Sequence, residues 1–77
     1  MTVTQAVIFP KDLYDTTRAR RWMKRHRFNP IKRVHETTRY LRYRIKEPDY
    51  NRYEYRTQTL PSGLKLIIGI PINAMVY

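Results

Sequence analysis

Arginine and tyrosine side chains alternate along residues 39–56, which read RYLRYRIKEPDYNRYEYR. The guanidinium group of arginine is a flat, forked donor that matches phosphate or carboxylate, and a tyrosine ring can stack on a base or a ribose. If this segment forms two paired strands, one face of the hairpin carries the following residues: Tyr40, Arg42, Arg44, Arg52 and Arg56. We expect this face to bind an anionic partner, most simply DNA or RNA, through its phosphates.

A second set of cations has helical spacing. Ala19, Trp22, Met23 and His26 recur at the intervals of an amphipathic helix and predict one from Thr16 to about residue 27. The remaining arc is basic, and the residues expected to contact the same partner are Arg20, Arg21, Lys24 and Arg25. The apolar arc is needed to cover the sheet, so a membrane is not expected as a partner.

The charge of the chain is concentrated in its middle. The 77 residues carry 16 Lys+Arg and 6 Asp+Glu, a net charge of +10. Residues 18–56 hold all of this excess, because the cations and acids outside that span cancel. The sequence therefore predicts a basic surface of defined location, and not a basic tail.

No reaction centre is expected. The chain has no cysteine, Ser62 is its only serine, and His26 and His35 lack the spacing of a zinc site. Pro48-Asp49 with Glu54-Tyr55-Arg56 resembles the PD…ExK signature of metal-dependent nucleases, whose carboxylates converge on Mg²⁺. Here Asp49 lies in a predicted turn five residues before Glu54, arginine replaces the lysine, and the surplus positive charge opposes a divalent metal. We expect a protein that is not an enzyme, with no metal, no cofactor and no small-molecule substrate.

Strands and turns are predicted from alternation and from Pro and Gly. Asp15 is a suitable N-cap for the helix, Asn29-Pro30 ends it, and Gly69 marks a bulge or a close backbone approach. The predicted strands span residues 3–9, 37–46, 52–58 and 64–70, with turns at 47–49 and 60–63.

This order, β-α-β-β-β, predicts an α+β fold in which one amphipathic helix packs on a mostly antiparallel four-stranded sheet. We expect the last three strands to form a meander and the more apolar first and last strands to lie at the sheet centre. Residues 1–71 are predicted to form a single domain, followed by an apolar tail, 72–77. No apolar run is longer than four residues, which is far too short to span a bilayer, and the first residues lack the features of a signal peptide.

Several spaced motifs resemble a small uncharacterised domain encoded by tailed phages and large DNA viruses. They are the Ala19-x-x-Trp22-Met23-x-x-His26 helix, Thr37-x-x-Tyr40-x-Arg42-Tyr43-Arg44, Tyr55-Arg56-Thr57, and Gly63-Leu64-Lys65-Leu66-Ile67-x-Gly69. The resemblance covers residues 5 to 70. It implies a viral origin and a compact α+β domain with no assigned active site.

The chain departs from the family at three positions. Arg27 replaces the glycine that follows the histidine at the helix end, which puts a left-handed cap there in doubt. Glu36 stands where the family has Asp, and Ile45 stands where the family has Gln.

Three roles follow from the sequence and the resemblance. The first is a protein that binds nucleic acid through its Arg/Tyr surface. The alternative is a minor virion component that cements other virion proteins, and the third is an inhibitor of a host protein. The expected location is the host cytoplasm or the virion.

Overall fold

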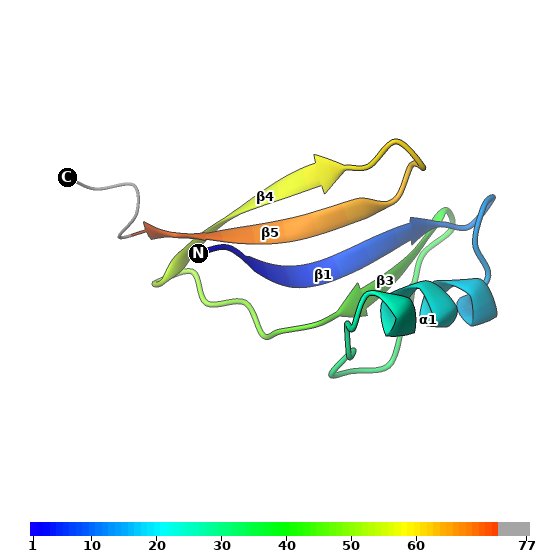
Figure 1. Ribbon diagram of the computed structural model, residues 1–77, viewed down its shortest axis with the longest axis horizontal. Coiled ribbons are helices and arrows are strands. Elements are labelled where there is room, and N and C mark those ends of the chain that lie inside the picture. The colour runs from blue at the N-terminus through cyan, green and yellow to red at the C-terminus, as the bar shows by residue number, and fades with distance from the viewer. Residues whose placement is uncertain (73–77) are drawn as a thin grey trace.

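The computed structural model describes residues 1–72 as one helix and a five-stranded antiparallel sheet (Figure 1). The elements in chain order are β1 (Val3–Pro10), α1 (Thr16–Arg25), β2 (His35–Glu36), β3 (Tyr40–Arg44), β4 (Tyr53–Thr59) and β5 (Lys65–Pro71). The predicted α+β class is confirmed. Of the predicted tail 72–77, only Ile72 lies within the described residues.

The strand order is β2-β3-β1-β5-β4. The expectation that the first and last long strands occupy the interior is confirmed, because β1 pairs with both β3 and β5. Of the predicted meander, the pairing of β4 with β5 is confirmed and the pairing of β3 with β4 was wrong. β3 and β4 lie on opposite sides of the β1–β5 pair, and the segment that joins them passes the end of the sheet to reach its other edge (Figure 1).

The physical reason is that β1 is apolar enough to be buried between two neighbours. Its Val7 and Phe9 lie opposite Tyr43 and Leu41 of β3, and all four side chains are buried. A hairpin of β3 with β4 would instead place Leu41 and Tyr43 against a strand whose side chains are mostly polar.

A further strand, β2, makes the sheet five-stranded where four strands were predicted. It has only two residues, both exposed, so no alternation reveals it. It belongs to a segment that covers the outer edge of β3: Ile31 N–H donates to the Arg44 carbonyl (2.9 Å), and Thr37 N–H donates to the Tyr40 carbonyl (2.9 Å). This edge of the sheet is therefore closed.

The helix covers one face of β1 and β3 (Figure 1). Ala19 and Met23 are fully buried against Phe9, and Trp22 packs edge-on against the same ring. The Asp15 carboxylate accepts a hydrogen bond from Arg18 N–H (2.8 Å), so the predicted N-cap is confirmed.

The helix ends two residues earlier than predicted, in a Schellman motif built on Arg27. Phe28 N–H donates to the Met23 carbonyl (2.8 Å) and Arg27 N–H to the Lys24 carbonyl (3.2 Å). Arg27 has φ 62°, which is the left-handed conformation that favours glycine. The cap that the sequence put in doubt is thus formed, with arginine at the strained position, and Phe28 stacks on Trp22 beside it.

Two irregularities fit the sheet together. The pairing of β1 with β5 shifts at Gln5, a buried residue whose carbonyl accepts from Ile45 N–H (2.8 Å) and whose Nε2 donates to the Lys46 carbonyl (3.0 Å). Gly69 is a close approach, as one of its two predicted roles stated, because the ring of Tyr55 lies against it. The bulge is therefore in β1 and the close contact in β5.

Candidate nucleic-acid interface

The sheet register fixes which of the predicted contact residues share a face. Arg42 lies opposite Ile8, and Arg44 lies opposite Ala6. Their neighbours Leu41 and Tyr43 point toward the helix, so Arg42 and Arg44 point away from it. Tyr40 has the same parity. The structure thus brings three predicted residues together on the face that the helix leaves uncovered.

Arg52 and Arg56 do not join them, which corrects the shared face expected from a β3–β4 hairpin. Arg56 lies opposite Ile68 on β4, two positions from Gln58, which lies opposite the core residue Leu66. Arg56 therefore occupies the helix side of the sheet at its far edge. Arg52 lies in the turn that precedes β4. The reason is the strand order, which separates β3 from β4 by two strands.

Arg42 and Arg44 instead meet cations from the segment that closes the edge of β3. A hollow of about 170 Å³ is lined by five basic side chains, which we call the β3-edge cluster: Lys32, Arg33, His35, Arg42 and Arg44. Sequence reasoning missed the first three because residues 31–36 show no strand periodicity. The adjacent pair Lys32-Arg33 after Pro30 was the available signal, but only the pairing of His35 with Arg42 places it beside β3.

One carboxylate lies against the β3-edge cluster. Glu47 contacts Lys32 Nζ (3.1 Å) and an Arg44 guanidinium nitrogen (3.4 Å). More than half of the Glu47 side chain is exposed, so solvent screens these ion pairs. Among residues 1–72, no carboxylate lies within 4 Å of the Arg33 or Arg42 guanidinium. The cluster therefore keeps a clear excess of positive charge.

Tyr40 is half-buried and already has a cationic neighbour. Lys65 Nζ lies 5.1 Å from the centre of its ring, a cation–π contact. Lys65 comes from β5 and lies opposite Ile8, which also pairs with Arg42, so these two cations flank Ile8 on the uncovered face. Lys65 is a further cation at this face, and it lies outside residues 18–56, where the sequence located the excess charge.

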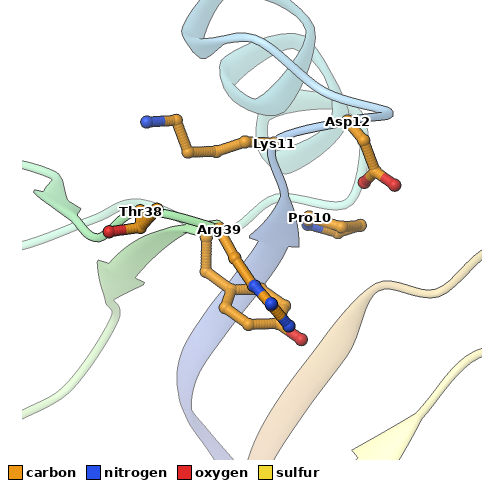
Figure 2. A pocket seen from close by; sticks show the side chains of 6 residues that line it. Pro10, Lys11, Asp12, Thr38 and Arg39 are labelled. Atoms are coloured by element: carbon orange, nitrogen blue, oxygen red, sulfur yellow. The ribbon is translucent and has the colours of Figure 1, made fainter.

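A second hollow lies where β1 ends. It measures about 450 Å³ and is lined by Pro10, Lys11, Asp12, Thr38, Arg39 and Tyr40 (Figure 2). Lys11 Nζ is paired with the Glu36 carboxylate and also donates to the Thr37 carbonyl (3.2 Å). Asp12 adds a second negative charge to this site. Its mixed charge makes it a poorer anion site than the β3-edge cluster.

The helix cations form a separate surface. Arg20, Arg21, Lys24 and Arg25 are all exposed on α1, which lies on the opposite face of the sheet from Arg42 and Arg44. Arg21 and Arg25 line a shallow hollow of about 220 Å³. The protein thus carries two basic patches, separated by the sheet.

Arg20 also acts on the core. The Tyr43 hydroxyl is buried, and no atom of residues 1–72 completes a hydrogen bond with it. Burial raises the pKa of Tyr43 above its ordinary value of 10.0, and the nearby Arg20 charge partly opposes this rise in pKa. Tyr43 is therefore a core residue whose hydroxyl is buried near the Arg20 guanidinium.

The residues of the nuclease-like motif have local roles. The Asp49 carboxylate accepts from Asn51 N–H (3.1 Å) in the turn before β4, and Glu54 contacts Arg56 (3.5 Å). Within residues 1–72, no group of three or more His, Asp or Glu side chains is arranged to hold a metal ion. In the same residues, no helix has the length and apolar character needed to cross a membrane.

Comparison of the chain with family models, with curated proteins and with solved structures finds no match.

Proposed function

We propose that the protein binds nucleic acid through the β3-edge cluster, with phosphate contacts and little sequence preference. The observation that carries this proposal is the convergence of Lys32, Arg33, His35, Arg42 and Arg44 on one hollow. Two chain segments supply these side chains, and Glu47 is the one carboxylate of residues 1–72 that forms ion pairs with them.

The chemistry of the β3-edge cluster favours a phosphate backbone. Arginine donates through a rigid fork that matches two phosphate oxygens, and three of the five residues are arginines. Nucleic acid supplies phosphates at regular spacing. The β3-edge cluster and Lys65, which lies further across the same face of the sheet, can therefore contact successive phosphates.

The helix patch is a secondary surface in this proposal. It lies across the sheet from the β3-edge cluster, so one short duplex cannot lie flat on both. We assign the tight contacts to the cluster, because all of its cations line one hollow. The helix cations are divided between two hollows: Arg20 and Lys24 line one, and Arg21 and Arg25 line the other.

The resemblance drawn from the sequence supports a non-enzymatic viral protein that acts in the host cytoplasm or in the virion. A protein that faces a packaged genome needs phosphate contacts without sequence preference, so the virion role is compatible with the proposal. Detection of the protein in purified particles distinguishes packaging from a cytoplasmic role.

The test compares two variants of equal charge. Fluorescence anisotropy with labelled single-stranded and double-stranded oligonucleotides gives the binding constant over a series of salt concentrations. Arg33→Ala/Arg42→Ala should weaken binding and make the slope of log affinity against log salt shallower by about 0.7–0.9 per lost phosphate contact. Arg21→Ala/Arg25→Ala removes the same charge from the helix and should change the slope less.

Two results overturn the proposal. A wild-type slope near zero excludes phosphate binding. Equal losses in both double variants would mean that overall charge, and not the β3-edge cluster, determines the affinity.

A further inference from the structure

The two edges of the sheet are built differently. The β2 side ends in a two-residue strand, and hydrogen bonds from Ile31 and Thr37 cover the rest of β3. The other side ends in β4, a strand of seven residues that, among residues 1–72, pairs only with β5. Figure 1 shows β4 running along the outside of the sheet over most of its length. A long open edge is a template for pairing with another strand.

The hydrogen-bond phase shows which groups of β4 point outward. Ile72 N–H donates to the Arg52 carbonyl (2.9 Å), and Leu60 N–H donates to the Leu64 carbonyl (2.8 Å). In an antiparallel ladder, residues that bond the neighbour alternate with residues whose N–H and C=O face away from it. The even-numbered residues therefore bond β5, and the odd-numbered ones face outward: Tyr53, Tyr55, Thr57 and Thr59.

Most of these outward groups have no backbone partner within residues 1–72. Tyr53 N–H donates to the Asp49 carbonyl (3.0 Å), so this first outward N–H of β4 is not available to another strand. From Tyr55 onward the edge contains no proline, bulge or lysine, the devices by which sheet edges usually block pairing.

We propose that β4 pairs antiparallel with β4 of a second copy of this chain, in the register that places Tyr55 opposite Tyr55 of the other copy. In this register, the N–H groups of Tyr55 and Thr57 reach the Tyr55 and Tyr53 carbonyls of the partner, and the reverse pair forms by symmetry. The two sheets then join into one continuous sheet through four backbone hydrogen bonds, because Tyr53 N–H is already bonded to the Asp49 carbonyl and does not donate to the Thr57 carbonyl of the other copy.

The charges on β4 select this register. Glu54 and Arg56 stand on one face of the strand and are both exposed. With Tyr55 on the two-fold axis, Glu54 of each copy lies opposite Arg56 of the other, at a non-hydrogen-bonded position where side chains are closest. A shift that centres the axis on Arg56 or on Glu54 places like charges opposite each other, which is destabilising. The contact between Glu54 and Arg56 within one chain (3.5 Å) is long and exposed, so both groups are available to the second copy.

Sedimentation of the full chain from micromolar to millimolar concentration tests the proposal. The wild type should show a monomer–dimer equilibrium. Glu54→Arg and Arg56→Glu should each raise the dimer dissociation constant by about tenfold or more, because two attractive cross-strand pairs become repulsive. An equimolar mixture of these two single variants should recover the dimer, since opposite charges then face each other at both positions.

A backbone variant provides the independent measurement. Thr57→Pro removes one outward N–H and leaves every bond between β4 and β5 in place, so it should abolish the dimer and retain the folded monomer, as judged by circular dichroism and urea unfolding. Thr57→Val keeps the N–H and should retain the dimer. A wild type that is monomeric throughout the range overturns the proposal, as does a dimer that withstands Thr57→Pro or fails to respond to the charge exchange.

Discussion

The ring of Tyr55 occupies the space that a side chain at Gly69 would need. A Cβ atom built on Gly69 would lie 2.9 Å from Tyr55 Cε1, closer than such atoms approach in proteins. Val3 and Tyr53 crowd the same position at 3.1 and 3.3 Å. Glycine in β5 is thus a packing requirement imposed by the neighbouring strands, and its backbone conformation is ordinary.

We expect Gly69→Ala to lower the free energy of unfolding by about 1–3 kcal/mol, because the ring of Tyr55 must move to admit the methyl group. Urea denaturation at low protein concentration measures the loss. The same substitution in a Tyr55→Ala background should cost clearly less. An equal cost in both backgrounds would show that the ring is not the source of the strain.

Arg27→Gly should stabilise the protein by about 1 kcal/mol, since glycine adopts the left-handed conformation at φ 62° without the steric cost that arginine incurs. Thermal or urea unfolding gives the change. Arg27→Ala is the matched control: it removes the same charge, keeps the strain, and should bring no comparable gain. A gain of equal size in both variants would assign the effect to charge.

Tyr43 should make stability fall in alkaline solution. Burial raises the pKa of Tyr43 in the folded state, so the phenol ionises more readily in the unfolded chain. The stabilising contribution is therefore complete below about pH 10 and is lost as pH rises through the higher pKa of the folded state. Urea unfolding across this range should show a steeper decline for the wild type than for Tyr43→Phe.

The same Tyr43→Phe variant should be no less stable than the wild type at neutral pH. The Tyr43 hydroxyl that it removes is buried without a hydrogen-bond partner among residues 1–72. Tyr50→Phe, at a ring that is 75% exposed, is the control and should leave the alkaline decline unchanged. A steep decline that persists in Tyr43→Phe would place its origin elsewhere.

Glu47→Gln should strengthen oligonucleotide binding by roughly fivefold at low salt, because it removes the carboxylate that contacts Lys32 and Arg44. Its effect on stability should be small, as both ion pairs are exposed. Anisotropy at fixed ionic strength measures the gain. Glu54→Gln removes a carboxylate from the far edge of the sheet and should not reproduce it. Equal gains in both variants would contradict a binding site at the β3-edge cluster.

Local signals in the sequence predicted the elements well. Asp15, the Ala19–Trp22–Met23 spacing and the alternation around Leu41 and Tyr43 each report short-range physics, and the corresponding elements are present. The turn at 60–63 also forms as its Pro and Gly predicted, with Gly63 N–H donating to the Leu60 carbonyl (2.9 Å).

These local signals did not predict the full set of strand pairings. Strands that are adjacent in the chain usually pair, so Arg42 and Arg56 were expected on one face of a β3–β4 hairpin. In the structure β3 pairs with β1 instead, and Arg56 lies on the other face of the sheet. For the same reason, three of the five residues of the β3-edge cluster were not predicted. Hydrogen bonds between residues 31–37 and β3 position Lys32, Arg33 and His35 beside Arg42 and Arg44. The residue types of this segment do not predict that pairing.

The central position of β1 has a consequence for biosynthesis. β1 is made before the other strands, yet its two neighbours in the sheet, β3 and β5, begin 30 and 55 residues after β1 ends. While the chain is being translated, the apolar residues of β1 have no complete set of partners, and contacts this distant in sequence form slowly. Because β5 pairs with β1, the sheet can be completed only after β5 has left the ribosome.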